Sequence, residues 1–229
     1  MSDKIQWVYS SPNNRQLRDR YNQWAKDYER DLTETFGRPN REPIVDLTLK
    51  YVPQNALILD AGAGTGTMGQ WLHKEGYDNL VGIDLSPGML AEAQKKHVYT
   101  QLRQMILGEP LDFPTATFDA VTACGVFTYG HAPSHSFDEL IRVTKPEGYI
   151  IFTLRPNFYE SSDFKDKMTD LETQGKWTLT ERGDKYQAEP KGQPDLYLQT
   201  WVYQKVGQQH SLNSGKPRYI GNKSMVIGG

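Results

Sequence analysis

A glycine loop preceded by a carboxylate is the part of this 229-residue chain best suited to chemistry. Asp60 follows the apolar run Leu57-Ile58-Leu59, and Gly62, Gly64 and Gly66 then occupy alternate positions. This pattern predicts a buried strand that turns sharply into a helix, where the missing side chains let the backbone approach a ligand. Asp60, at the strand end, is expected to face that ligand.

Three interpretations of this loop are open: a dinucleotide site, a site for a cofactor without phosphate, and an ordinary turn that binds no ligand. The segment 64–69 satisfies G-x-G-x-x-G, the pattern of dinucleotide sites. In those sites the first glycine follows the strand directly and a pyrophosphate lies at the helix N-terminus. Here Asp60 would repel a pyrophosphate and attract an ammonium group. S-adenosylmethionine (SAM) carries an ammonium and a sulfonium but no phosphate, so charge favours SAM.

Composition narrows the class of protein. With 26 Lys and Arg against 28 Asp and Glu, the chain has no basic excess, and no nucleic-acid or membrane partner is expected. The single Cys124 excludes a disulfide framework and a cysteine zinc site, and no metal is expected. Residues 1–20 are polar and no apolar run is long enough to span a bilayer, so we expect a cytoplasmic protein without a signal peptide.

Alternating strands and helices are predicted to position the loop. Residues 1–15 suggest a loose lead-in, followed by a helical stripe of Tyr21, Trp24, Ala25, Tyr28 and Leu32. Asn40 is expected to cap a second helix with Pro43 in its first turn. We assign residues 1–52 to an N-terminal helical lid or cap, 53–206 to the core and 207–229 to a disordered tail.

The core pattern predicts an α/β fold, a doubly wound parallel sheet with right-handed crossovers. A capping box at Ser136 and Glu139 is expected to start one of its helices. Expected strands are 56–60, 80–84, 99–106, 118–124, 149–154, 177–187 and 196–206, and expected helices are 67–75, 87–96, one from 136, and 163–174.

Four segments in this order resemble class I SAM-dependent methyltransferases of the domain 11/25 type. They are ILDAGAGTG (58–66), GIDLSPGML (82–90), FPTATFDAV (113–121) and LIRVTKPEG (140–148). The pattern Tyr-x-x-Trp-Ala-x-x-Tyr at 21–28 is similar to Williams–Beuren-region methyltransferase-like proteins. The resemblance covers about 21–206 and implies a Rossmann-like, seven-stranded, mostly parallel sheet with an antiparallel C-terminal hairpin.

The resemblance also implies SAM as cofactor, S-adenosylhomocysteine (SAH) as product, and roles for particular residues. Asp84 would accept both ribose hydroxyls, unless it only supports the next helix. Asp60 would help hold the ammonium group, directly or through water. Leu85 and Met89 would sandwich adenine or simply pack. The predicted cofactor-binding residues are Tyr21, Tyr28, Asp60, Ala61, Gly62, Gly64, Gly66, Asp84, Leu85, Met89, Leu107, Gly108 and Cys124.

One position departs from the family. Many members carry an acid after strand three that accepts the adenine amino group, whereas Leu107 stands at that place here. Adenine would then be read by the backbone of Leu107 and Gly108, or by Glu109.

The acceptor is expected beyond strand four. His131 is the candidate general base, with His135 as the alternative, and Tyr129 lies beside it. Arg155 would orient a substrate carboxylate, or pair with Asp60 or Glu160. Tyr21, Trp24 and Tyr28 would form a lid helix whose aromatic faces contact the sulfonium, or would simply pack as core.

These features predict methyl transfer to an O, N or S atom of a small molecule by a monomer or homodimer. The chain lacks the Asn/Asp-Pro-Pro-Tyr signature of many nucleic-acid and amide-nitrogen methyltransferases. Two alternatives stay open: a SAM-binding regulatory or structural protein with little catalysis, and an NAD(P)-dependent reductase.

Overall fold

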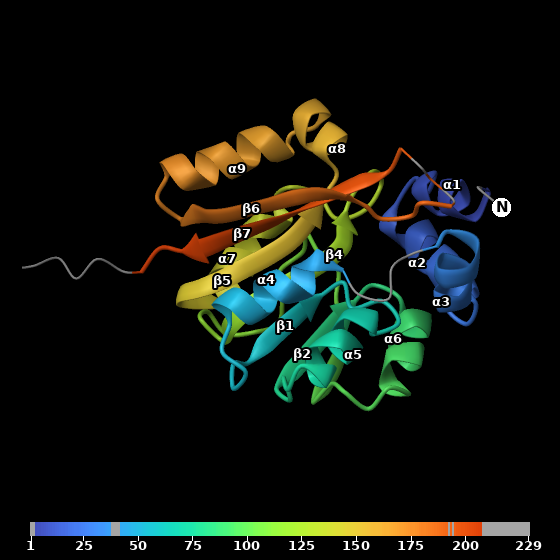
Figure 1. Cartoon of the computed structure of the whole chain (residues 1–229), viewed down its shortest axis with the longest axis horizontal. Coiled ribbons are helices and arrows are strands. Elements are labelled where there is room, and N and C mark those ends of the chain that lie inside the picture. The colour runs from blue at the N-terminus through green and yellow to red at the C-terminus, as the bar shows by residue number, and fades with distance from the viewer. Residues whose placement is uncertain (1–2, 38–41, 192, 194, 208–229) are drawn as a thin grey trace, which may run out of the picture.

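A mixed sheet forms the centre of the protein, for which a computed structural model describes residues 3–37, 42–191, 193 and 195–207. The strands are β1 (Ile58–Ala61), β2 (Leu80–Asp84), β3 (Gln101–Gln104), β4 (Phe118–Phe127), β5 (Thr144–Leu154), β6 (Trp177–Gln187) and β7 (Tyr197–Lys205). Their order in the seven-stranded sheet is β3-β2-β1-β4-β5-β7-β6 (Figure 1). Strands β1 to β5 pair in parallel, and β7 pairs antiparallel with both β5 and β6. The predicted α/β fold with an antiparallel C-terminal hairpin is confirmed.

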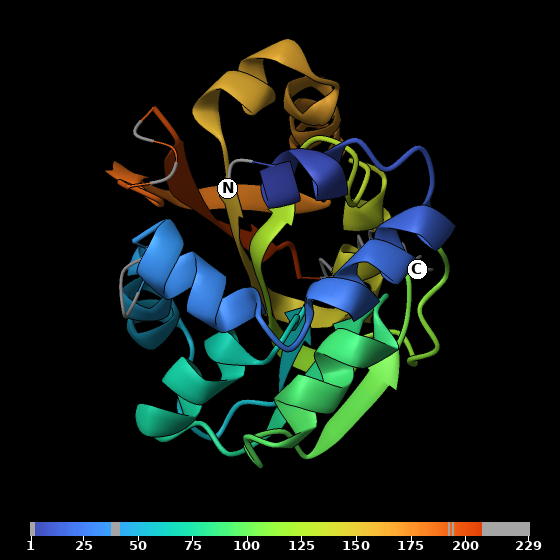
Figure 2. The same cartoon turned by 90° about the vertical axis from the view of Figure 1, so that its right-hand side faces the viewer.

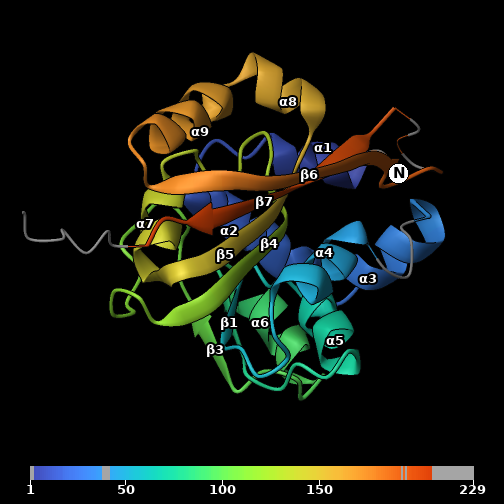
Figure 3. The same ribbon diagram turned by 60° about the vertical axis from the view of Figure 1, so that its left-hand side comes forward.

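Helices cover both faces of this sheet. They are α1 (Asp3–Tyr9), α2 (Asn14–Trp24), α3 (Tyr28–Arg30), the π-helical turn η1 (Asp31–Thr35), α4 (Pro43–Tyr51), α5 (Thr67–Lys74), α6 (Pro87–Gln94), α7 (Ser136–Val143), α8 (Pro156–Ser161) and α9 (Phe164–Thr173). Ile58 of β1 packs with α4 and α5, whereas Leu59 packs with α7 and α9. Successive side chains of a strand point to opposite faces, so the apolar run of β1 supplies both cores. Figure 3 shows α8 and α9 along β6, far from α5 and α6.

The N-terminal helices α1 to α3 and η1 form a third, separate hydrophobic cluster. Its buried members are Ile5, Val8, Leu17, Trp24, Leu32 and Phe36. These helices lie beside the carboxyl ends of the parallel strands, and Figure 2 looks onto them with the strands behind (Figures 1 and 2). The expectation of a loose lead-in over 1–15 is wrong, because Ile5 and Val8 bury an apolar face of α1 and Asn13 caps α2 by accepting a hydrogen bond from the Gln16 N–H.

Polar contacts fix these helices to the sheet domain. Asn22 Oδ1 accepts hydrogen bonds from the Ser86 hydroxyl at 2.7 Å and from the Gly88 N–H at 2.8 Å. Glu29 pairs with Lys96 at 2.7 Å. The N-terminal helices therefore rest on the start and the end of α6.

Helix α7 begins at Ser136 and Pro43 lies in the first turn of α4, both as predicted, but the N-cap residues differ. His135, not Ser136, occupies the N-cap of α7, so the predicted capping box is wrong. Glu139 instead pairs with Arg142 at 2.7 Å, and its Oε2 accepts the N–H of Leu111, which lies outside α7. Asn40 lies outside the described residues, and α4 begins at Pro43. Because α4 packs against the sheet, the helical lid predicted over residues 1–52 would end before Pro43.

Other boundaries shift where tertiary pairing extends or ends an element. Strand β4 continues to Phe127, since Phe127 still pairs with Leu154 beyond an irregularity in the register. Helix α8, which the sequence pattern did not predict, follows β5 directly. Of the expected disordered tail 207–229, residues 208–229 lie outside the described residues, and Gly207 is described just after β7.

Candidate cofactor and acceptor site

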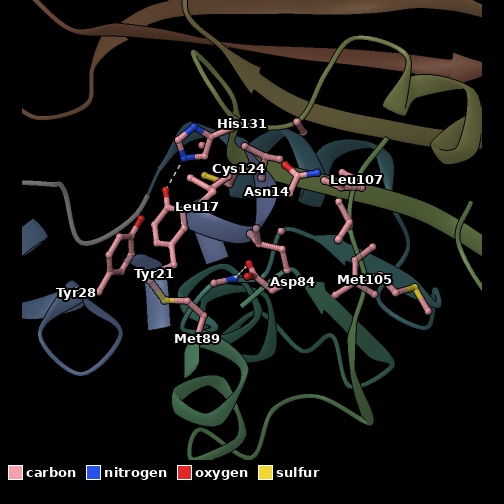
Figure 4. A pocket seen from close by; sticks show the side chains of 18 residues that line it. Asn14, Leu17, Tyr21, Tyr28, Asp84, Met89, Met105, Leu107, Cys124 and His131 are labelled. Carbon is pink, nitrogen blue, oxygen red and sulfur yellow. Dashed lines mark hydrogen bonds between the residues drawn. The ribbon is translucent and has the colours of Figure 1, made fainter. Parts of the chain in front are cut away.

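A cleft of about 710 Å³, partly open to solvent, lies between the N-terminal helices and the carboxyl ends of β1, β2 and β4. Predicted site residues in its lining are Tyr21, Tyr28, Gly62, Gly64, Asp84, Leu85, Met89, Leu107, Cys124 and His131. In Figure 4, Tyr28 lies at one end of the cleft, Met105 and Leu107 lie at the other, and Asp84 lies between them. Residues that the sequence analysis missed are Asn14, Leu17, Ile83, Met105, Ile106, Gly125, Val126 and Ala132.

The glycine loop has the left-handed backbone that its composition suggests. Gly62 has φ +84°, and a Cβ there would lie 2.4 Å from Val126 Cγ2. Gly64 has φ +53°, and a Cβ there would meet nothing within 4 Å. Gly62 is therefore required for packing as well as backbone shape. Gly64 instead leaves open space in the cleft.

Asp84 presents a carboxylate to the cleft from the end of β2. Its Oδ2 accepts the Gly64 N–H at 2.9 Å and its Oδ1 accepts the Ser86 N–H at 2.8 Å. Burial raises the pKa of Asp84 to about 6. Each carboxylate oxygen has a further lone pair, so the fixed group can accept two more hydrogen bonds from a ligand.

Asp60 is buried beneath the loop and does not line the cleft. Its Oδ2 accepts the Tyr99 hydroxyl at 2.6 Å, and Tyr99 Oη accepts the Gly69 N–H at 3.1 Å. Burial raises the pKa of Asp60 to about 7. The predicted direct contact with a ligand therefore has no counterpart in the lining of the cleft, and the observed contacts of Asp60 hold the loop.

Tyr99 is a supporting residue that the sequence analysis missed. A Cβ on Gly69 would lie 2.3 Å from its ring, and Cβ atoms on Gly66 or Gly82 would lie 3.1 Å from it. The three glycines indicate that a large side chain lies among them, but only the fold shows that this side chain is Tyr99.

His131 is held as a neutral imidazole. Its Nδ1 bonds the Tyr129 carbonyl at 2.8 Å, and its Nε2 lies 2.6 Å from the Tyr21 hydroxyl (Figure 4). A carbonyl only accepts, so Nδ1 carries the proton and Tyr21 donates to Nε2. Burial lowers the pKa of His131 to about 4. A proton from a ligand would therefore reach the unprotonated Nε2 of His131 only through the Tyr21 hydroxyl.

The remaining predicted residues lie around the cleft rather than in it. Ala61 is buried in β1, and Gly66, with φ +87°, precedes α5. Gly108 contacts Pro133 and His135. The Tyr129 side chain is 44% exposed and packs on Phe158, so only its carbonyl serves the site.

A second pocket of about 640 Å³ adjoins the cleft and shares Tyr21, Tyr28 and Gly125 with it. Arg155 lines this second pocket and donates from Nη2 to the Tyr9 hydroxyl at 3.0 Å. The alternative pairings with Asp60 or Glu160 are wrong, because Asp60 bonds Tyr99 and Glu160 bonds Lys165. The lining consists of Ile5, Tyr9, Tyr21, Trp24, Tyr28, Leu32, Glu42, Gly125, Phe127, Thr128, Thr153, Arg155, Ala188, Glu189, Leu196 and Leu198.

Glu42 joins the two pockets and was also missed. It is 1% exposed, and its Oε2 accepts the Cys124 thiol at 3.1 Å and the Tyr186 hydroxyl at 2.8 Å. Cys124 lines the cleft, so this contact crosses the wall between the pockets. The partners lie 82 and 144 residues away along the chain, which leaves no local signal.

Comparisons with known proteins agree with this geometry. A family described as "Methyltransferase domain" matches residues 59–152. The human protein named methyltransferase-like protein 27 is 39% identical over 166 residues, which are 69% of this chain and 66% of that protein. The 18S rRNA (guanine-N(7))-methyltransferase of Bos taurus is 40% identical over 76 residues, 32% of this chain and 27% of that protein. The chain thus spans no more than about two thirds of these relatives.

The fold comparison reaches further than the sequence comparison. The crystal structure of the [4+2]-cyclase SpnF has a TM-score of 0.66 at 14% identity, and the match covers 86% of this chain and 97% of the SpnF chain.

Within the described ranges, no helix is long and apolar enough to cross a membrane, and no group of three or more potential metal ligands occurs. With its ordered motifs, sheet topology and relatives, the chain belongs to the class I SAM-dependent methyltransferases.

Proposed function

We propose that this protein transfers a methyl group from SAM to an O, N or S atom of a small-molecule acceptor. The observation that carries the proposal is the pair of adjoining pockets with Tyr21, Tyr28 and Gly125 in their shared wall. A transfer between two molecules needs their reacting atoms side by side, and binding in neighbouring pockets supplies that alignment.

The residues of the cleft fit SAM. Asp84 lines the cleft and would accept the ribose hydroxyls, as an acid at the end of strand two does in related nucleotide sites. Gly64 leaves room for the methionine part. Leu85, Met89 and the segment at Leu107 supply apolar contacts for adenine. When bound, SAM supplies a methyl group activated on a sulfonium.

The aromatic residues of the shared wall suit that end of the cofactor. The rings of Tyr21 and Tyr28 lie 6.2 Å apart, centroid to centroid, and stand edge to face. Ring faces attract a sulfonium by cation–π interaction and exclude water from the place of transfer. We keep His131 as the proposed base. An acceptor proton would pass to Tyr21 Oη as Tyr21 passes its own to His131 Nε2.

Two measurements test the proposal. Calorimetric titration with SAH should show binding, and Asp84→Ala should weaken it at least about tenfold, since a charged acceptor is lost. The wild type should then transfer labelled methyl groups from SAM to members of a panel of phenols, carboxylates, amines and thiols, with total RNA as a second arm.

The outcomes separate the alternatives. No heat from folded protein would contradict the cofactor site. Label found only in RNA would contradict a small-molecule acceptor, and the bovine relative named as an rRNA methyltransferase makes this arm informative. SAH binding without transfer to any acceptor would favour a regulatory SAM-binding protein. The cytoplasmic location stays a prediction from the sequence.

A further inference from the structure

Arg155 is a cation of the second pocket with unused hydrogen-bonding capacity. Its Nη2 donates to the Tyr9 hydroxyl at 3.0 Å, and its guanidinium carbon lies 5.3 Å from the centroid of the Tyr9 ring. Among the residues that the structure describes, none of the ion pairs involves Arg155. The other N–H donors of the guanidinium therefore remain for a ligand.

The lining of this pocket is about equally polar and apolar, and a set of apolar side chains supplies the apolar part. Ile5, Leu32, Phe127, Leu196 and Leu198 contribute aliphatic and aromatic surface, beside the rings of the shared wall. An apolar surface together with a guanidinium that has no ion-pair partner among the described residues suits an apolar body carrying one anionic group.

We propose that the second pocket binds an acceptor with an apolar or aromatic body and a carboxylate, and that Arg155 and Tyr9 hold the carboxylate. This inference rests on the proposed function and names the substrate class of its acceptor site. With the carboxylate at Arg155, the body of the acceptor extends toward Tyr21 and Tyr28, where the pockets meet.

Charge favours a carboxylate over a phosphate ester. The Arg155 guanidinium in this lining balances the single charge of a carboxylate better than the two charges of a phosphate ester, and Glu42 and Glu189, which also line the pocket, have partners of their own. Position also argues against the carboxylate of SAM itself as the partner. Arg155 is absent from the lining of the cleft, where the glycine loop would hold the methionine part.

The test is calorimetric titration of SAH-loaded protein with matched probes. The acids are 4-hydroxyphenylacetate, 3-phenylpropionate and decanoate, each compared with its primary amide, and phenyl phosphate serves as the dianion. At least one acid should bind at least about tenfold more tightly than its amide, as expected for a charge-assisted contact. Arg155→Gln should remove this preference and leave SAH affinity unchanged. Arg30→Gln is the matched control, because Arg30 is exposed and lines neither pocket.

Several results would overturn the inference. These are equal binding of acids and amides, no binding of any probe, tighter binding of phenyl phosphate, or an acid preference that survives Arg155→Gln. Loss of SAH affinity in folded Arg155→Gln would assign the guanidinium to the cofactor instead. Methyl transfer to carboxylic-acid acceptors at the wild-type rate by Arg155→Gln would overturn this inference and preserve the proposed function. Failure of the wild type to bind SAH would remove the proposed function.

Discussion

A methyl group added at Gly64 separates cofactor binding from folding. Gly64 lines the cleft with φ +53°, and a Cβ there would meet nothing within 4 Å. Gly175 supplies a matched control in the turn between α9 and β6. It has φ +65°, a Cβ there would also meet nothing within 4 Å, and it lines neither pocket. Gly64→Ala and Gly175→Ala therefore impose the same backbone strain in different places.

The expected stability loss is small and equal in the two variants. A left-handed Ala costs roughly 1–2 kcal/mol, and the reduced entropy of the unfolded chain offsets part of that cost. A net loss of about 1 kcal/mol lowers Tm by about 2–4 °C in a domain of this size. SAH at one hundred times its Kd should stabilise the wild type by about 2.7 kcal/mol, a rise of roughly 5–11 °C.

The assay is thermal unfolding of the three proteins with and without SAH, supported by calorimetric titration. Gly175→Ala should keep the full SAH-induced rise. Gly64→Ala should keep less than about 2 °C of it, because its methyl group occupies space that the cofactor needs. A full rise in Gly64→Ala would refute the placement of the cofactor against the loop. Loss of the rise in Gly175→Ala would show that strain, and not contact, controls binding.

Other residues give further tests. Asp84→Asn should weaken SAH binding at least about tenfold at pH 8. The SAH affinity of the wild type should decrease when the pH is below about 6, because the carboxylate is then protonated. A wild-type pH profile as flat as that of the variant would count against this role. In ligand-free protein acid has the opposite effect and stabilises the fold, because folding raises the pKa of Asp84 and the folded state binds the proton more tightly. Wild-type Tm should therefore rise relative to that of Asp84→Asn as the pH falls from about 6 to about 4. Tyr99→Phe should lower the free energy of unfolding in urea by about 1–3 kcal/mol, because buried Asp60 loses its hydroxyl donor; an unchanged midpoint contradicts this. Asn22→Ala should speed proteolysis of the N-terminal helices, because it removes the acceptor for Ser86 and Gly88, and equal cleavage rates would show that this anchor is dispensable.

Local features of the sequence determined the strands and the loop. The predicted limits 80–84 and 177–187 are those of β2 and β6. The glycine spacing and the acid at Asp84 indicated a cofactor cleft, because positive φ angles and the polarity of a strand end are properties of a few adjacent residues. The resemblance built on these segments named the family.

Tertiary structure decided what each polar side chain faces. Asp60 meets Tyr99 39 residues away, His131 meets Tyr21 110 residues away, and Arg155 meets Tyr9 146 residues away. In the folded protein Asp60 bonds Tyr99 beneath the loop, burial keeps His131 neutral, and Arg155 lies in the second pocket. Periodicity and spacing describe neighbours along the chain, whereas burial and pKa depend on groups that only packing of the N-terminal helices on the sheet brings together.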